Sequence, residues 1–346
     1  MDSEALPAEL AQGNTAGLAR AISQVENRRP GFERLLAALH PRLGRARRIG
    51  ITGPPGAGKS TLTQQLVQLW RRRGLTVAVV AVDPTSPHSG GALLGDRIRM
   101  ESVALDRGVY IRSMATRGSL GGLATSTREV CDVLDAGGFD RILIETVGVG
   151  QSELAVTTMA DSTVLVLVPE SGDGIQALKS GVMEVADVYA INKADRPGAA
   201  NLAREIEVTQ GLRRGNAFRG IRAHHGARVD GRAAGRPAAA PAAAAWEPPV
   251  LLTTATAGTG IDALADALDA HHAWMESQGE LAARRRNRFA ARTREVVERG
   301  LQRWVWSETK AEEHLQERIG EVTAGRISPY ELAAEILAGL KEGARV

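Results

Sequence analysis

From residue 47 to about residue 254, short uninterrupted apolar runs alternate with longer segments that have helical periodicity. Most of the apolar runs are rich in Val, Ile and Leu, as expected of parallel strands covered on both faces. The segments between them are long enough to be crossover helices. The predicted strands are Arg48–Thr52, Thr76–Asp83, Val109–Ser113, Arg141–Thr146, Thr163–Pro169, Val188–Asn192 and Val250–Thr254, and the predicted helices span 62–73, 122–136, 150–160, 175–186 and 197–212. This alternation predicts an α/β fold with a doubly wound, mostly parallel sheet.

Helical patterns precede and follow this region, so we expect three parts at residues 1–45, 46–262 and 263–346. In the first part, apolar residues recur three and four positions apart, and this spacing predicts two amphipathic helices. These residues are Leu18, Ala21, Ile22 and Val25, then Phe32, Leu35, Leu36 and Leu39 after the break at Pro30-Gly31. Because neither helix can bury its apolar face alone, we expect both to pack against the domain that follows.

The last part is predicted to be a helical arm, in which a charged helix carries a stripe of apolar residues. The residues of this stripe are Phe289, Val296, Val297, Leu301, Trp304 and Val305. A final helix is expected over 330–340, with Pro329 at its first turn and Ile327-Ser328 as the capping region. The stripe must be buried somewhere, either against the chain's own domain or in the seam of a homodimer.

A segment from about residue 223 to 249 interrupts the α/β rhythm. It is rich in Ala and Pro and has almost no bulky apolar residue, so we expect a disordered surface insertion. The pair His224-His225 suggests a metal site, but no carboxylate or Cys lies nearby to complete one.

Composition narrows the possible partners and compartments. The formal net charge of +3 is too small to indicate binding to nucleic acid or to an anionic membrane. No apolar run is long enough to span a bilayer, and the acidic N-terminus lacks the layout of a signal peptide. Cys131 is the only cysteine, which excludes an internal disulfide and a multi-Cys metal site. A cytoplasmic location is therefore expected.

The first predicted strand leads into a phosphate-binding loop, Gly53-Pro54-Pro55-Gly56-Ala57-Gly58-Lys59-Ser60-Thr61, which is followed by a predicted helix. This strand–loop–helix context turns the pattern G-x-x-x-x-G-K-[ST] into a phosphate site. Its glycines let backbone N–H groups approach phosphate oxygens, and the helix presents its positive N-terminal end. Lys59 is expected to pair with the β and γ phosphates and Ser60 to bind Mg²⁺.

A second motif, Asn192-Lys193-Ala194-Asp195, stands at the end of an apolar strand and matches the guanine-binding pattern N-K-x-D. The Asp195 carboxylate can accept hydrogen bonds from guanine N1–H and the exocyclic amine. Adenine lacks this donor pair, so it would leave a carboxylate unpaired. Thr254-Ala255-Thr256 follows the last strand, and its backbone N–H groups are expected to meet guanine O6.

Acidic residues at strand ends predict the Mg²⁺ side of the site. Asp83 and Glu145 each end a predicted strand, although Asp83 could instead be a turn carboxylate. Asp96 lies in a Gly-rich loop that could order over the metal, or it could be a solvated acid. We expect Lys59 and Glu145 to support catalysis by positioning and electrostatics. Gln151 could orient the attacking water or simply begin a helix. Since the sequence does not establish a water-positioning residue, the chain alone is expected to hydrolyse its nucleotide slowly.

With these motifs in place, the chain resembles the MeaB-type, or ArgK-like, GTPases of the SIMIBI class of P-loop proteins, over nearly its whole length. The run Glu145-Thr146-Val147-Gly148-Val149-Gly150-Gln151-Ser152-Glu153 is the most specific feature, because ordinary GTPases lack it. The other stretches that carry the resemblance are Gly53–Thr61, Ala81–Pro84 with Ser89–Met100, Arg117–Gly122 and Asn192–Asp195.

The resemblance implies a GTP- and GDP-binding chaperone of adenosylcobalamin-dependent acyl-CoA mutases, chiefly methylmalonyl-CoA mutase. Members of the family gate cofactor loading and protect the mutase from inactivation. The resemblance also implies Mg²⁺ contacts from Ser60, Asp83, Asp96 and Glu145, and a homodimer built through the C-terminal arm. A third switch region would contain Asp173, Gln176 and Lys179. Glu170-Ser171 departs from the family pattern just before this switch, and the Ala/Pro-rich insertion is not a family feature.

Two other functions stay open on the sequence alone. One is a transport-associated ATPase or kinase that acts on basic amino acids, although the N-K-x-D motif and the lack of a spanning segment argue against it. The other is a metallochaperone GTPase, which would need a Cys/His cluster that a single cysteine cannot provide.

Overall fold

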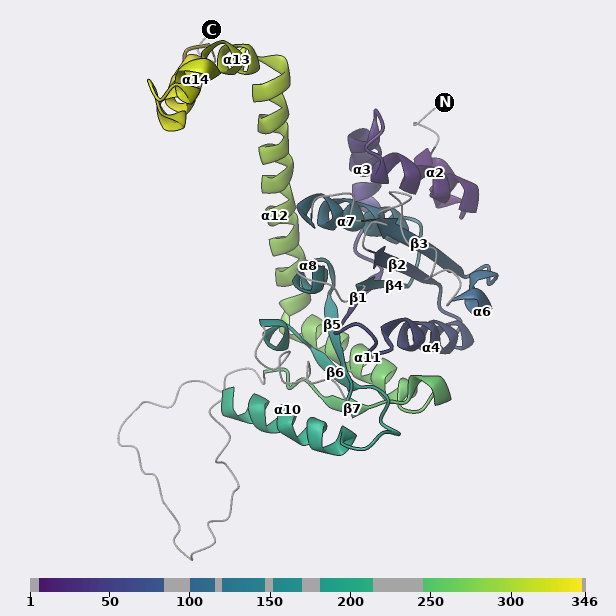
Figure 1. The fold of residues 1–346 in the computed structure, drawn as a ribbon. Helices are drawn as coiled ribbons and strands as arrows, with labels where there is room; N and C mark the ends of the chain where they lie inside the picture. Colours follow the sequence, from purple (N-terminus) through teal and green to yellow (C-terminus); the bar gives the residue numbers. More distant parts are fainter. Residues whose placement is uncertain are drawn as a thin grey trace, which may run out of the picture. The chain divides into compact units, whose positions relative to one another are not determined.

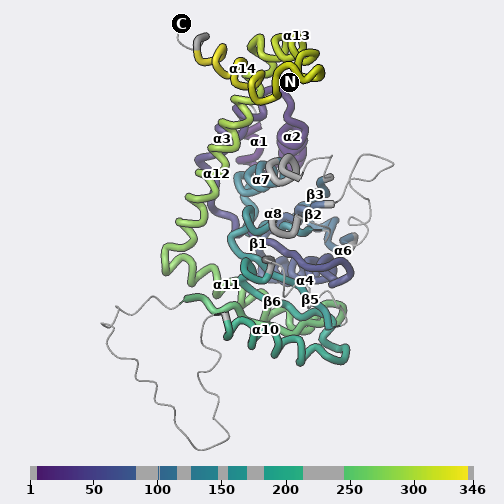
Figure 2. The backbone as a smooth tube through the Cα atoms, turned by 60° about the vertical axis from the view of Figure 1, so that its left-hand side comes forward, coloured from purple at the N-terminus to yellow at the C-terminus, as the bar shows by residue number. Residues whose placement is uncertain are grey.

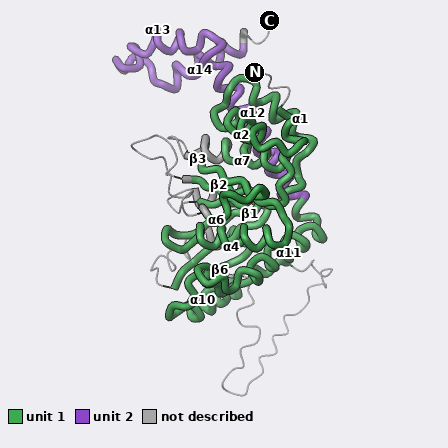
Figure 3. The backbone as a smooth tube through the Cα atoms, turned by 90° about the vertical axis from the view of Figure 1, so that its right-hand side faces the viewer, with its two compact units in different colours: residues 1–281 green, residues 282–346 purple. Residues whose placement is uncertain are grey.

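The computed structural model describes residues 6–83, 100–115, 120–146, 152–169, 181–213 and 245–343. The chain divides into two compact units, residues 1–281 and residues 282–346, which are coloured green and purple in Figure 3. The first unit contains the sheet and the N-terminal helices. The described part of the second unit consists of helices joined by short non-helical segments at residues 309–310 and 324–328.

A seven-stranded parallel sheet forms the centre of the first unit (Figure 1). Its strand order is β3-β2-β4-β1-β5-β6-β7, so the predicted α/β fold with a parallel sheet is confirmed. All seven predicted strands are present, with ends that differ by a few residues. Their bounds are Arg47–Thr52 (β1), Val77–Asp83 (β2), Val109–Ala115 (β3), Arg141–Thr146 (β4), Ser162–Leu167 (β5), Val188–Ile191 (β6) and Val250–Leu252 (β7).

One face of the sheet is covered by the N-terminal helices together with α7, α8 and α10. The apolar faces predicted from the 3- and 4-residue spacing are buried against β2, β4 and α7, so these helices pack on the following domain as expected (Figure 2). The helices on this face are Leu6–Ala11 (α1), Thr15–Glu26 (α2), Phe32–Leu39 (α3), Leu120–Ala136 (α7), Ser152–Met159 (α8) and Ala199–Arg213 (α10), with short 3₁₀ turns at His40–Arg42 (η1) and Gly181–Glu184 (η2).

The opposite face is covered by α4 (Lys59–Arg72), α6 (Glu101–Ala104) and α11 (Ile261–Gln278). The fully buried Trp70 of α4 and the buried Leu264 and Leu268 of α11 join the strands in one apolar core. Alternate residues of each strand point to opposite faces, so continuous apolar strands are needed to fill both layers.

A buried arginine ties the start of β1 to α7. The Arg48 guanidinium donates to Asp132 at 2.8 Å and to Asp135 at 3.1 Å, and all three side chains are buried. Burial alone would lower the pKa of Arg48, but Asp132 and its neighbours raise it above its ordinary value. Asp135 also accepts hydrogen bonds from the backbone N–H groups of residues 44–46. The network therefore fixes the position of the first residues of β1. Because β1 is a short strand, this also positions the loop that follows its carboxyl end.

The second unit continues α12 (Glu280–Arg303) into a π-helical segment at Trp304–Glu308 (η4), followed by α13 (Ala311–Thr323) and α14 (Pro329–Gly343). The last helix begins at Pro329 as predicted. Ser328 and Glu331 cap it reciprocally, since each side chain accepts a hydrogen bond from the other residue's backbone N–H. On α12, the predicted stripe stays well exposed within one chain: Leu301 is 54% and Phe289 39% exposed.

Candidate functional site

The phosphate-binding loop connects the carboxyl end of β1 to the N-terminus of α4. Gly53 has a φ of 141°, and a Cβ at this position would lie 2.1 Å from the carbonyl oxygen of Val166 in β5. Gly58 caps α4 with a φ of 86° and lies against the side-chain amide of Asn192. Only glycine satisfies both the conformation and the space at these two positions. The loop thus keeps its backbone close to β5 and to the strand end that carries Asn192.

Lys59 points back into the loop that it follows. Its ammonium group donates to the carbonyl oxygens of Gly53 at 2.7 Å and Pro54 at 3.0 Å, and the residue is 6% exposed. Phosphate oxygens are stronger acceptors for an ammonium group than neutral carbonyls. The loop therefore presents a buried positive charge where the pattern predicts the β and γ phosphates.

Glu145 lies directly beside the loop, because β4 pairs with β1 and places Glu145 opposite Ile51. One carboxylate oxygen accepts the Ser60 hydroxyl at 2.6 Å and the other accepts the Thr63 hydroxyl at 2.9 Å. Glu145 is 2% exposed and Thr63 is fully buried. The structure therefore brings together two of the four predicted metal ligands, Ser60 and Glu145, as adjacent hard oxygen donors.

The sequence did not single out Thr63. Its spacing of three residues from Ser60 places both hydroxyls on one face of α4, which is the only signal that the sequence offers. Its partner is 82 residues away and becomes visible only once β1 and β4 are known to be neighbours.

Asn192 joins the phosphate loop to the segment after β7. Its amide nitrogen donates to the Ala57 carbonyl at 2.8 Å, and its oxygen accepts from the Ala255 N–H at 3.0 Å and the Thr253 hydroxyl at 3.3 Å. Asn192 is 2% exposed. One side chain thus holds three segments that are distant in sequence, and the predicted guanine-binding residues gather around it.

The residues after Asn192 turn sharply toward solvent. Lys193 has a φ of 57°, a conformation that is uncommon outside glycine and is often found at functional sites. The Ala194 N–H donates to the Thr253 carbonyl at 3.0 Å, and Asp195 is exposed. Thr254 pairs with Thr259 across the short η3 helix (Ala255–Ala257), with Ala255 buried and Thr256 exposed. The loop expected to support the base therefore lies beside the N-K-x-D segment.

The remaining predicted residues are only partly within the described structure. Asp83 ends β2, whose pairing with β4 brings it to the same edge of the sheet as Glu145. Pro55 and Gly56 are exposed in the loop and Thr61 is half-buried in α4. Asp96, Asp173, Gln176 and Lys179 lie outside the described residues, as do Gln151 and the pair His224-His225.

Within the described ranges, no group of three or more His, Cys, Asp or Glu side chains is arranged to hold a metal. A Mg²⁺ site here would instead combine the Ser60 hydroxyl with carboxylates from strand ends and with the nucleotide. Nor does any described helix combine the length and the apolar character needed to cross a membrane.

Comparison with known proteins agrees with this geometry. The family model described as methylmalonyl Co-A mutase-associated GTPase MeaB matches residues 18–310. A protein of Pyrococcus abyssi named as a GTPase is 42% identical over 332 residues, which cover 94% of this chain and 93% of that protein. The mouse methylmalonic aciduria type A homolog, mitochondrial, is 32% identical over 350 residues, covering 96% and 78% of the two chains.

A solved structure, the crystal structure of LAO/AO transport system kinase, has a TM-score of 0.64 and 26% identity and covers 99% of both chains. The family match spans the loop at Gly53–Thr61, the strand that carries Glu145 and the segment Asn192–Asp195. The chain belongs to the MeaB family of GTPases, and the nucleotide that it binds and hydrolyses is GTP.

Proposed function

We propose that this GTPase is a Mg²⁺-dependent chaperone of an adenosylcobalamin-dependent acyl-CoA mutase of the methylmalonyl-CoA mutase type. In this role it gates the loading of the cofactor and protects the mutase from inactivation. The observation that carries the proposal is the match of residues 18–310 to a family described as mutase-associated. The exposure of Asp195, the residue proposed to select guanine, also suits a switch that another protein senses.

Mg²⁺ fits the donor set beside the phosphate loop. Ser60 and Glu145 offer oxygen ligands 2.6 Å apart, and Asp83 and Asp96 are the further ligands proposed. The ion would neutralise charge that develops on the phosphates during hydrolysis. Thr63 would keep the Glu145 carboxylate oriented when the Ser60 hydroxyl turns toward the ion. GTP turnover should therefore stop when EDTA removes Mg²⁺ and return when Mg²⁺ is added.

The nucleotide is held at two ends in this proposal. Lys59 and the loop N–H groups bind the phosphates, and Asp195 selects guanine through its N1–H and exocyclic amine. The segment Thr254-Ala255-Thr256 is proposed to meet guanine O6 through the Thr256 N–H, because the Thr254 N–H donates to the Thr259 carbonyl and the Ala255 N–H donates to Asn192. Asn192 holds both ends in register, because its amide contacts the phosphate loop and the Ala255 N–H. Asp173, Gln176 and Lys179 are proposed as the switch that reports the nucleotide state.

The arm is proposed to form a homodimer through the stripe on α12. Val297 and Leu301 are each 54% exposed within a single chain, and a symmetric partner could bury both. Sedimentation velocity tests this: Leu301→Glu should convert a dimer to a monomer, whereas Gln302→Glu, one residue off the stripe, should leave it dimeric. A wild-type monomer at micromolar concentration would contradict the proposed dimer.

The mutase partnership is tested by binding. Immobilised chain loaded with GDP or with a non-hydrolysable GTP analogue should retain an acyl-CoA mutase with different affinities in the two states. The phosphate-loop variant Lys59→Ala provides the control, since its mutase affinity should no longer depend on nucleotide. Equal retention in every state by the wild-type chain would contradict a nucleotide-controlled chaperone.

A further inference from the structure

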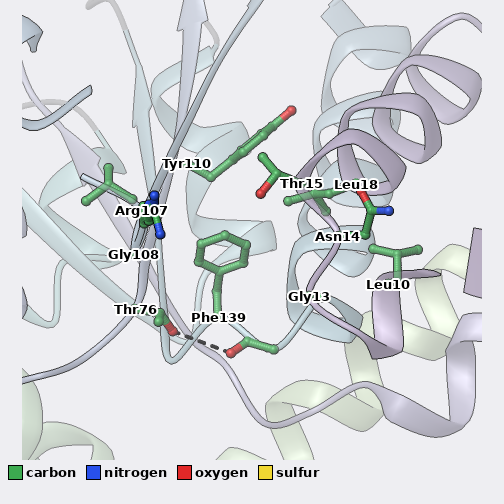
Figure 4. Close-up of a pocket in the computed structure, with 13 residues that line it drawn as sticks. Leu10, Gly13, Asn14, Thr15, Leu18, Thr76, Arg107, Gly108, Tyr110 and Phe139 are labelled. Carbon is green, nitrogen blue, oxygen red and sulfur yellow. Dashed lines mark hydrogen bonds between the residues drawn. The ribbon is translucent and has the colours of Figure 1, made fainter. Parts of the chain in front are cut away.

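A cavity of about 170 Å³ lies at the amino end of the sheet, away from the nucleotide site. It is bounded by the segments before β2, β3 and β4 and by the start of α2 (Figure 4). The phosphate loop leaves the carboxyl end of β1, and these strands are parallel. Strands of six or seven residues, which rise about 3.3 Å per residue, separate the two sites by roughly 20 Å. The cavity is therefore not part of the GTP site.

Part of the cavity wall is aromatic and aliphatic. Tyr110 and Phe139 contact one another with ring centroids 6.3 Å apart and an interplanar angle of 56°. Leu10 and Leu18 lie on the α1–α2 side and are buried. In Figure 4 the two rings stand between the turn before β3, which carries Arg107, and the helix that carries Thr15. Such walls accommodate a flat apolar ring.

The charged part of the lining is positive. Among the described residues that line the cavity, Arg107 is the only one with a charged side chain, and none has a carboxylate. The Thr15 hydroxyl adds a neutral donor on the opposite side (Figure 4). A ring with a negative group would therefore be favoured over one with a positive group, because a guanidinium binds a planar carboxylate through paired hydrogen bonds.

The volume of the cavity matches a ligand of one ring. An apolar cavity of about 150 Å³ holds a molecule of benzene. We propose that this cavity binds a monocyclic aromatic carboxylate, with its ring against Tyr110 and Phe139 and its carboxylate on Arg107. This site is independent of the proposed mutase function and of the GTP site.

Calorimetric titration of the full chain tests the proposal, with saturating GDP and Mg²⁺ present so that anions cannot enter the phosphate loop. The probes are benzoate, neutral benzamide and cationic benzylamine, which share one ring and differ in charge. Benzoate should bind about fivefold more tightly than benzamide, since a single solvent-accessible ion pair adds little more than this. Benzylamine should bind most weakly.

Two variants locate the binding. Arg107→Gln should reduce the affinity for benzoate to that for benzamide and leave the affinity for benzamide unchanged. The control is Arg34→Gln, at an exposed arginine of α3 outside the lining, which should change neither affinity. Thr15→Phe should fill the cavity and weaken both probes. Since Arg107 is exposed, its substitution tests the site even where Thr15→Phe impairs folding. Absence of saturable benzoate binding, or benzoate affinity unchanged by Arg107→Gln, would overturn the proposal.

Discussion

Replacing Asn192 with alanine removes a side chain that joins the phosphate loop to the segment after β7. Three hydrogen bonds disappear, at 2.8 Å to Ala57, 3.0 Å from Ala255 and 3.3 Å from Thr253. Because Asn192 is 2% exposed, water cannot readily replace it at the Ala57 carbonyl or the Ala255 N–H. At about 1 kcal/mol for each well-formed bond, the free energy of unfolding should fall by about 2–3 kcal/mol. The melting temperature should then fall by roughly 5 °C for a unit of this size.

The same substitution should weaken GDP binding by at least about tenfold, because the two ends of the nucleotide site lose their common support. Calorimetry with GDP and thermal unfolding followed by circular dichroism measure the two effects. Thr253→Val is the matched control, since it keeps the shape of the side chain and removes the longest of the three bonds together with the 3.5 Å contact from the Thr253 hydroxyl to the Ile191 carbonyl. If Asn192→Ala lost no more stability and no more GDP affinity than Thr253→Val, the bridging role of Asn192 would be wrong.

Three further predictions test other parts of the molecule. Asp195→Asn should shift nucleotide preference from GTP toward xanthine nucleotides, whose C2 carbonyl can accept from the Asn amide; competition binding that still favours GTP would exclude the role given to Asp195. Thr63→Val should slow Mg²⁺-dependent GTP hydrolysis severalfold without changing GDP affinity in EDTA, because only the orientation of Glu145 is lost. Equal hydrolysis rates for the variant and the wild-type chain would contradict this role of Thr63. Hydrogen bonds from the Ser328 N–H and hydroxyl lower the pKa of Glu331. The stability that this cap adds to α14 is therefore fully present above the pKa that Glu331 has in the unfolded chain, and it is lost as the pH falls through the lower pKa of the folded chain. An NMR titration that gave Glu331 an ordinary pKa would disprove this cap.

The strands could be predicted well because each is a continuous apolar run in a sheet that is covered on both faces. Their ends were predicted less well, since hydropathy does not reveal where a hydrogen-bond ladder stops. β7 illustrates the limit: the apolar run suggests Val250–Thr254, but Thr254 leaves the ladder to pair with Thr259. The N-terminal helices were predictable for the same reason as the strands, because each had one apolar face that needed a partner.

The phosphate loop and the N-K-x-D segment were predictable because their chemistry is local in sequence. The contacts between these segments were not, because they depend on strand order. Thr63 and Asn192 each contact residues more than 60 positions away. The contact of Thr63 with Glu145 follows from β1 lying beside β4, and the contact of Asn192 with Ala255 follows from β6 lying beside β7. The buried Arg48 network is equally invisible in the sequence, where its partners look like ordinary acidic residues of an amphipathic helix.

The boundary of the C-terminal arm shows a different limit. Both α11 and α12 carry apolar residues at helical spacing, so periodicity alone does not separate a helix of the sheet domain from one of the arm. Burial makes the distinction: Leu264 and Leu268 of α11 lie in the core of the sheet, and the second compact unit starts at residue 282. The expected division at residue 263 therefore falls within α11, and the dimer role of the arm stays a prediction.

The central claim is that this GTPase is a switch whose GTP turnover is governed by an acyl-CoA mutase. The most direct test measures the steady-state rate of GTP hydrolysis by the purified chain with Mg²⁺, alone and with increasing amounts of an adenosylcobalamin-dependent mutase. Slow hydrolysis alone and a saturable increase with the mutase, which Glu145→Gln abolishes, is the predicted result. A rate that no such mutase changes at saturating concentration would contradict the claim.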